Sequence, residues 1–187
     1  MLINDGNGTG ISAGVSAAHE LLTHARTITH AAFESRAAGR LFFVATDFVA
    51  LTTTASYSAI AYLKNTSSTH NIFLHRVTAS STVTHQWRLL AQPTAGTIID
   101  DGTAASKVNA NLTSSLTLAA SAFKGADAKT FTDGTIMQQW ASDIGRNVDI
   151  YDGEILLGPN DAVGFECKPS ASCDVGVTII AVQELIT

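Results

Sequence analysis

The sequence predicts an all-β fold, an antiparallel β-sandwich of the jelly-roll type that follows a short N-terminal arm. From residue 39 onward, segments rich in β-branched and aromatic residues follow one another. Turn-forming residues separate these segments at intervals of roughly 8 to 15 residues, and no long amphipathic helix lies between them. Such spacing favours a sandwich or barrel over a doubly wound sheet, and a jelly roll of about eight strands best fits the length.

The expected strands are ordered along the chain as follows: 40–46, 48–53, 56–64, 71–78, 84–90, 104–112, 116–122, 135–140, 149–157, 162–167 and 174–185. The segments 71–78 and 84–90 are expected to pair with each other through residues 79–82. A turn is expected at residues 158–161, because Pro159 and Asn160 occupy its two central positions. Asp100 and Asp101 are expected in a turn that follows residues 97–99.

A single domain with an N-terminal arm is expected: the arm at residues 1–38 and the sandwich domain at residues 39–187. The glycine-rich residues 5–10 do not fit a regular element. The next stretch has apolar residues at helical spacing, at Leu21, Ala25, Ile28 and Ala32, with Gly39 as a helix C-terminus. It can also be divided into a strand at 22–28 and a short helix at 29–36, which Thr29 would cap. We favour the divided version and interpret the arm as a segment that contacts a sister subunit or an underlying shell.

Composition indicates a surface with few charges. Charged residues make up 14% of the 187, while 39 are Ser or Thr and 28 are Ala. An ordinary soluble domain is about a quarter charged. Either this is an alanine- and threonine-rich β protein from a high-GC genome, or other subunits cover much of the surface, and we favour the second. With a net charge of −5 and scattered Lys and Arg residues, no nucleic-acid partner is expected.

Membrane insertion and secretion are not expected. No segment has the 18 or so apolar residues of a membrane span, and hydroxyl residues interrupt the uncharged stretch 48–63. The N-terminus has no basic residue and does not resemble a signal peptide, so we expect synthesis in a cytoplasm. Cys167 and Cys173 flank a five-residue connection between two strands. They would bridge if the register suits, but reduced thiols are favoured because a cytoplasm is reducing.

The sequence contains no recognisable catalytic, cofactor or metal site. It has no Gly-x-Ser-x-Gly motif, and Gly6, Gly8 and Gly10 lack the strand, spacing and Lys of a phosphate loop. Asp5 and Asn7 offer oxygen ligands for calcium, but no further acidic ligand follows at the usual offsets. The six histidines form no metal-binding motif: His19, His24, His30, His70, His75 and His85. Only a weak metal or pH-sensing pair of His75 and His85 across the expected strand pair remains, and ordinary β histidines are the favoured interpretation.

The remaining polar and aromatic candidates have structural explanations. Paired carboxylates at Asp100 and Asp101, or at Asp149, Asp152 and Glu154, fit turns and a strand better than glycoside hydrolysis. Trp87 and Trp140 each lie inside an expected strand, where core packing is favoured over a sugar-stacking platform. Sequons at Asn7, Asn65 and Asn111 carry no meaning without a secretory route. No enzyme activity is therefore expected.

Several segments resemble virion proteins of tailed bacteriophages. The residues that carry the resemblance are GRLFF (39–43), SAIAYLKN (58–65), PTAGTII (93–99), DDGTA (100–104), NAN (109–111), SLTL (115–118), FKG (123–125), TDGT (132–135), ILLGPNDAVG (155–164) and VTIIAV (177–182). They cover nearly everything after the arm and are signatures of strands and turns. Residues 17–38 depart from the pattern.

The resemblance implies a capsid decoration (cement) protein. Proteins of this kind are jelly rolls that sit as trimers on the outside of capsids, so the expected partners are the major capsid protein and two further copies of the chain. The expected location is the outer capsid surface of the virion, after synthesis in the host cytoplasm. Similar sandwiches occur in tail, collar and fibre components, so a component that contacts a tail ring or a host glycan is the alternative.

Overall fold

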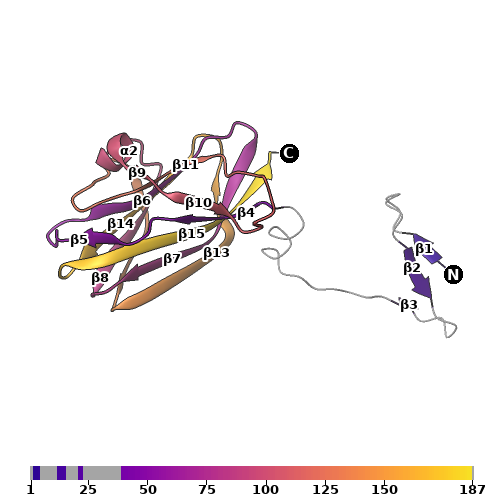
Figure 1. Ribbon diagram of the computed structural model, residues 1–187, viewed down its shortest axis with the longest axis horizontal. Coiled ribbons are helices and arrows are strands. Elements are labelled where there is room, and N and C mark those ends of the chain that lie inside the picture. The colour runs from indigo at the N-terminus through magenta and orange to yellow at the C-terminus, as the bar shows by residue number, and fades with distance from the viewer. Residues whose placement is uncertain (1, 5–11, 16–20, 23–38, 187) are drawn as a thin grey trace.

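The protein is built almost entirely of β-strands arranged in three antiparallel sheets (Figure 1). The structure, a computed structural model, describes residues 2–4, 12–15, 21–22 and 39–186. The N-terminal sheet has the order β1-β2-β3, with β1 at Leu2–Asn4, β2 at Ser12–Val15 and β3 at Leu21–Leu22. It shares no strand pairing with the two larger sheets.

The two larger sheets, here called sheet I and sheet II, form the sandwich. Sheet I has the order β10-β4-β15-β7-β13, and β5 also pairs with β15. Its strands are β4 (Leu41–Ala45), β5 (Val49–Leu51), β7 (His70–Ser81), β10 (Ser106–Asn109), β13 (Gly145–Leu157) and β15 (Cys173–Leu185). Sheet II has the order β12-β8-β14-β6-β11-β9. Its strands are β6 (Ser58–Asn65), β8 (His85–Ala91), β9 (Thr103–Ala104), β11 (Ala120–Lys124), β12 (Thr135–Ser142) and β14 (Ala162–Pro169).

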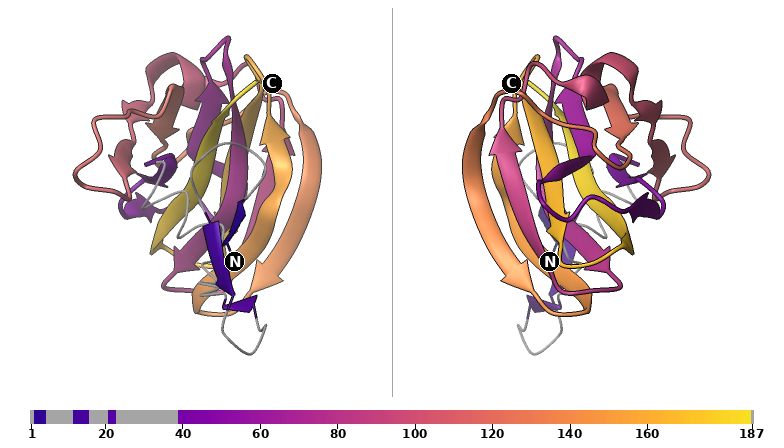
Figure 2. Two further views of the ribbon diagram at one scale, coloured as in Figure 1. Left: turned by 90° about the vertical axis from the view of Figure 1, so that its right-hand side faces the viewer. Right: turned by 90° about the vertical axis from the view of Figure 1, so that its left-hand side faces the viewer.

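Eight of these strands have the nested pairing of a jelly roll, so the predicted fold class is confirmed. In chain order the eight are β4, β6, β7, β8, β12, β13, β14 and β15. The first pairs with the eighth, the second with the seventh, the third with the sixth and the fourth with the fifth. The strands thus form one long antiparallel ribbon rolled into two facing sheets, which Figure 2 shows from two sides. The segment between β8 and β12 supplies β9, β10 and β11, which extend both sheets.

The main core lies between the two sheets. It is formed by every second residue of the facing strands, as expected when alternate side chains point to opposite faces. Trp87, Phe42 and Phe165 are its largest fully buried side chains. Burying one such aromatic side chain is worth about 1.5–3 kcal/mol, so this core is the main source of stability.

Most expected strands are present with shifted bounds, and two expectations about local structure are wrong. The segment 104–112 is divided between β9 and β10, and the strand expected at 116–122 is β11. Strands β7 and β8 do not pair, because β7 pairs with β13 and β15 in sheet I and β8 pairs with β12 and β14 in sheet II. Asp100 and Asp101 lie not in a turn but in the short helix α2 (Thr97–Asp101).

The turn at residues 158–161 is confirmed. The Asp161 amide donates to the Gly158 carbonyl at 3.0 Å, and Asn160 has a positive φ of 69°. In the arm, β1 and β2 were not anticipated. The expected helix at 29–36, and all but the first residue of the expected strand at 22–28, lie outside the described residues. The domain boundary after residue 38 stays a prediction.

Candidate interaction face

The outer face of sheet I departs from the usual alternation of apolar and polar residues. An antiparallel strand with one solvated face normally places a polar residue at every second position. In β15, however, the four residues Ile179–Val182 are all buried. Ile179 and Ala181 belong to the central core, while Ile180 and Val182 belong to a separate cluster on the other face. This strand therefore carries apolar side chains on both faces.

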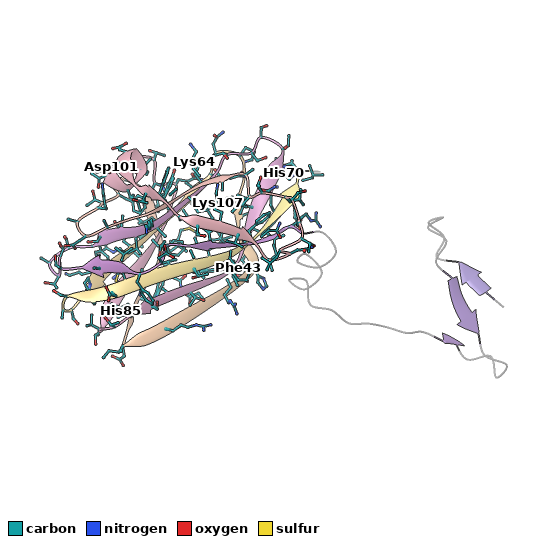
Figure 3. All side chains as sticks on the ribbon, in the orientation of Figure 1. Phe43, Lys64, His70, His85, Asp101 and Lys107 are labelled. Carbon is teal, nitrogen blue, oxygen red and sulfur yellow. The ribbon has the colours of Figure 1, made fainter. Side chains whose placement is uncertain are left out.

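Strand register places these outward residues in two rows across sheet I. One row consists of Val108, Phe43 and Ile180 on β10, β4 and β15. The other consists of Leu41, Val182, Phe73 and Leu156 on β4, β15, β7 and β13. Directly opposed residues on neighbouring strands are close enough for their side chains to touch. We call these seven residues the apolar face, and Figure 3 labels Phe43 within it.

The apolar face has a packed centre and an exposed rim. Leu41, Ile180 and Val182 are at most 7% exposed, and Phe73 and Ala110 pack against them. Phe43, Val108 and Leu156 are 37%, 45% and 48% exposed. In the described part of the chain, the cluster draws its apolar members from sheet I and from the residue that follows β10. The rim thus offers three large apolar side chains to a partner.

Arg76 adds a hydrogen-bond donor to this face. It lies opposite Ile180 in the register between β7 and β15, beside the row that contains Phe43. Its Nε atom is buried and has no hydrogen-bond partner among the described residues. An unpartnered buried donor costs about 1–3 kcal/mol. A partner that covers the apolar face and supplies an acceptor would remove that cost.

The corresponding face of sheet II is covered by the chain itself. Ala59, Tyr62 and Ala162 point outward from β6 and β14 and pack against Ile98 of α2, which is 0% exposed. Tyr62 stacks on Phe123 with ring centroids 5.9 Å apart and an interplanar angle of 7°. Ile99 and Phe131 complete the cover. Figure 1 shows α2 beside β6, β9 and β11 of this sheet.

Two glycines allow close contacts at sheet II: Gly164 lets Phe131 of the cover approach β14, and Gly125 lets the chain after β11 approach β6. A Cβ atom at Gly164 of β14 would lie 2.6 Å from the ring of Phe131, and one at Gly125 would lie 1.7 Å from the Ala59 carbonyl oxygen. Real Cβ contacts are not this short, so a side chain at either position would force its neighbour to shift. The close contact between sheet II and its cover is therefore specified by the sequence.

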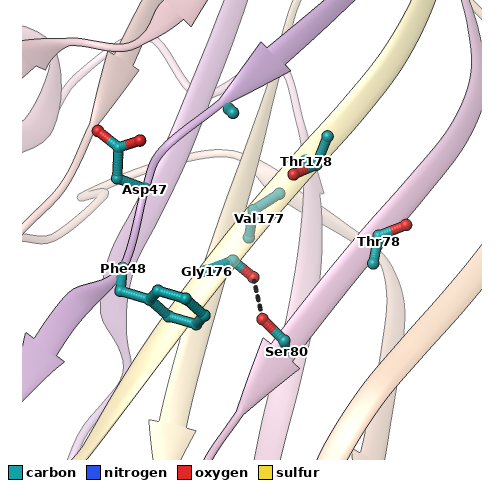
Figure 4. A pocket seen from close by; sticks show the side chains of 8 residues that line it. Asp47, Phe48, Thr78, Ser80, Gly176, Val177 and Thr178 are labelled. Carbon is teal, nitrogen blue, oxygen red and sulfur yellow. Dashed lines mark hydrogen bonds between the residues drawn. The ribbon is translucent and has the colours of Figure 1, made fainter.

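A groove of about 320 Å³ lies next to the apolar face (Figure 4). The Phe48 ring, which is 69% exposed, forms one wall beside Gly176 of β15. Thr78, Ser80 and Thr178 line it with hydroxyl groups, and Ser80 Oγ donates to the Gly176 carbonyl at 3.4 Å. Asp47, at φ 57°, also lines the groove, and its carboxylate lies 3.5 Å from Lys124 Nζ.

The three described histidines, His70, His75 and His85, do not assemble into a site. His75 lies on β7 of sheet I and His85 on β8 of sheet II, so the pairing on which their proximity depended is wrong. His85 is 2% exposed, its Nδ1 donates to the Val83 carbonyl at 2.8 Å if that nitrogen is protonated, and its ring contacts Trp87 edge-on. His70 Nδ1 lies 2.9 Å from the Thr69 hydroxyl. Among the described residues, which exclude His19, His24 and His30, no group of three residues could hold a metal.

The tryptophans are core residues, as favoured, and not a sugar platform. Trp87 is 0% exposed and stacks on Trp140, its cross-strand partner, with centroids 6.5 Å apart. Trp140 is partly buried against the central core. Stacking on a sugar requires an open ring face, which Trp87 does not have.

The acidic candidates have different surroundings. Asp101 on α2 forms an ion pair with Lys129. Burial raises the pKa of Asp149 on β13. Asp149 and Glu154 are separated by the irregularity of β13 between Ile150 and Ile155, and the Asp152 side chain is outside the described ones. The structure therefore does not bring these carboxylates together across a cleft.

The two cysteines are free and lie on different sheets. Cys167 is on β14 and Cys173 on β15, so the connection between them crosses the sandwich and is not a hairpin. Burial raises the pKa of both thiols, with Cys167 the more deeply buried. Ser81 Oγ donates to Cys173 Sγ at 3.7 Å, which partly offsets that rise. Both thiols are poor nucleophiles at neutral pH.

The other polar candidates are structural or lie outside the description. Asn65 is 0% exposed, and its side-chain amide donates to the carbonyls of His70 and Leu157 at 2.8 and 2.9 Å. Asn111 accepts from the Thr113 hydroxyl at 2.7 Å in a local turn. Asp5, Asn7 and the glycine-rich segment lie outside the described residues.

Sequence reasoning missed the apolar face, although a signal for it was present. Residues 41–44 read Leu-Phe-Phe-Val and residues 179–182 read Ile-Ile-Ala-Val, both without a polar interruption. Unbroken apolar runs are typical of strands buried on both faces. Two such runs on paired strands, β4 and β15, predict a sheet that requires a cover on its outer side.

The fold and this face together define a jelly-roll sandwich with one self-covered sheet and one sheet that presents an apolar surface. Comparison with models of known protein families gave no match, and comparison with curated protein sequences gave none. Within the described residues, no helix is long and apolar enough to cross a membrane.

Proposed function

We propose that the chain is a structural virion protein, a capsid decoration (cement) protein that binds the outer surface of a bacteriophage shell and stabilises it. The observation that carries the proposal is the apolar face of sheet I. Its exposed rim of Phe43, Val108 and Leu156 lies on a protein whose residues are only 14% charged. A freely diffusing domain usually covers or breaks up such a patch, whereas a subunit of an assembly buries it against a neighbour.

The resemblance to phage virion proteins supports the same role. The segments that carry the resemblance include parts of β4 and β15, which contribute to the apolar face, and β6 of the sheet behind it. The role also fits the physical demands on a shell. Many identical subunits, each making a modest contact, together oppose the outward pressure of packaged DNA. A rigid sandwich with a fixed apolar face suits such repeated contacts.

Purified particles test the proposal. We expect the chain to be present in near-stoichiometric ratio to the major capsid protein, measured by quantitative mass spectrometry of intact virions. Particles stripped of the chain should release DNA at a lower temperature, and adding the chain back should restore the original temperature. A ratio of only a few copies per particle would contradict the proposal and favour a tail or collar position.

A tail, collar or fibre component is the second candidate, and the groove beside Phe48 favours it. An exposed aromatic ring next to hydroxyl groups is the chemistry that recognises sugars. If this candidate holds, the protein should bind host glycans on a glycan array, and Phe48→Ala should abolish that binding. Ile144→Ala, at a 72% exposed residue outside the groove, is the matched control. Equal binding by wild type and Phe48→Ala would exclude the groove as a glycan site.

A further inference from the structure

The apolar face of sheet I and the N-terminal sheet each lack a packing partner among the described residues. The apolar face of sheet I exposes Phe43, Val108 and Leu156, and it holds the Arg76 Nε atom, which has no hydrogen-bond partner among the described residues. The N-terminal sheet is small and pairs with neither large sheet. The apolar face would be stabilised by a layer that shields it from water, and the N-terminal sheet would be stabilised by an apolar surface to pack on.

The N-terminal sheet is too small to be stable alone. Its strands have three, four and two residues. A small sheet is independently stable in water only with a hydrophobic face or with packing against another element. The sequence of the three strands contains no charged residue, and most of their positions are apolar: Leu2, Ile3, Ala13, Val15, Leu21 and Leu22. Such a sheet gains stability by packing on an apolar surface.

The N-terminal sheet also offers hydrogen-bond acceptors for the buried Nε atom of Arg76. In the order β1-β2-β3, both β1 and β3 are edge strands, and an edge strand carries carbonyl groups that have no partner within its sheet. A carbonyl is an acceptor that the buried Nε of Arg76 can donate to. The N-terminal sheet therefore offers apolar side chains for the apolar face and carbonyl acceptors for Arg76.

The segment between β3 and Gly39 determines which apolar faces the N-terminal sheet can reach. Sixteen residues, 23–38, separate β3 from Gly39. Sixteen residues reach at most about 55 Å when extended. From β10 to β13, sheet I has four strand spacings and is roughly 19 Å wide. The connection is therefore long enough to carry the N-terminal sheet beyond its own sheet I to the same face of a neighbour.

We propose that the N-terminal sheet of one copy packs on the apolar face of a second copy of this chain. The inference rests on the proposed role in an assembly and names the partner of the same face. Each subunit gives its N-terminal sheet and receives one on its apolar face, so two copies can exchange their sheets reciprocally. Closed around a symmetry axis, such contacts produce a ring.

Photo-crosslinking in the full-length protein tests the proposal directly. A Phe43→p-benzoylphenylalanine variant keeps an aromatic ring in the apolar face. The variant is prepared in ¹⁴N and ¹⁵N forms, which are mixed, allowed to exchange and then irradiated. We expect cross-links from position 43 to residues 2–22, with mixed-isotope pairs among them. Cross-links that join only residues of the same isotope would show that the sheet docks on its own domain, and would overturn the proposal.

Full-length point variants provide the second measurement. Ile3→Asp in the N-terminal sheet and Val108→Asp on the rim should each raise the dissociation constant of the assembly about tenfold or more, measured by analytical ultracentrifugation. Ile144→Asp, at an exposed apolar residue outside the face, is the control and should leave it unchanged. Circular dichroism confirms that each variant is folded. Wild-type assembly by both Ile3→Asp and Val108→Asp would overturn the proposal.

Both measurements use the isolated protein in solution without any shell. If self-association follows the prediction but the chain is absent from virions, the proposed function fails and the exchange stands. If the chain coats the shell but cross-links from position 43 of the isolated protein join only residues of the same isotope, the exchange fails and the proposed function stands.

Discussion

The outer faces of the two sheets resolve the same physical problem differently. Both carry an apolar cluster that water would otherwise contact. On sheet II the cluster around Tyr62 is covered by α2 and Phe131 of the same chain, so its burial contributes to folding. On sheet I the cluster around Ile180 keeps an exposed rim, so part of its burial remains for association. The difference is that the chain itself completes the burial of the cluster on sheet II, whereas the cluster on sheet I keeps apolar side chains exposed at its rim.

The largest expected effect is at the centre of the self-covered face. Ile98→Ala should lower the free energy of unfolding by about 2–5 kcal/mol, because it removes a fully buried side chain and leaves a cavity between α2 and sheet II. Ile98→Val, with a cost of about 0.5–1.5 kcal/mol, is the conservative control. Urea denaturation measures both. A loss below the value for Ile98→Val would show that α2 is not an energetic part of the fold.

Substituting one glycine on each sheet by alanine tests how much extra volume each outer face tolerates. Gly164→Ala places a Cβ 2.6 Å from the Phe131 ring and should cost about 1–3 kcal/mol, because the cover must shift. Gly176→Ala, on sheet I beneath Phe48, meets its nearest atoms at 3.1–3.5 Å and should cost less. Thermal unfolding of both variants checks the order. The reverse order would mean that the cover of sheet II yields more easily than the groove of sheet I.

The attachment of the cover should weaken in acid. The Asp133 carboxylate accepts from the Thr94 hydroxyl and from the amides of Thr94 and Ala95, and these bonds lower its pKa below the ordinary 3.8. The folded protein therefore binds this proton less readily than the unfolded chain does. The stabilisation is complete above about pH 4 and declines as the pH falls through the lowered pKa. Asp133→Asn should flatten this part of the stability profile, measured as urea midpoints at pH 6 and pH 3.

The smallest effect on folding is expected on the apolar face. Val108→Thr keeps a β-branched side chain at a 45% exposed position, so the free energy of unfolding of one subunit should change by no more than about 0.5 kcal/mol. The same change should weaken self-association. A larger loss of folding stability without any change in association would mean that this face belongs to the fold after all.

The sequence alone predicts where most strands lie, but it does not predict which strands pair. Runs rich in β-branched and aromatic residues and the turn at Pro159 and Asn160 predict local structure well, because side-chain shape and backbone preference act locally. Which strands pair depends on the rolled ribbon, so β7 and β8, adjacent in sequence, lie in different sheets. The site was missed for a related reason. Phe43, Val108 and Ile180 are far apart in the chain, and only the register places them in one row.

The nested pairing has a consequence for biosynthesis. The last strand of the sandwich, β15, occupies the centre of sheet I and contacts the first strand, β4, as well as β5 and β7. None of these neighbours can complete its pairing before β15 has left the ribosome. Closing so long a loop is slow, and until then the apolar strands of both sheets are exposed to other nascent chains. A cell that produces this protein therefore has to keep the strands of sheet I from associating with other chains until β15 is released.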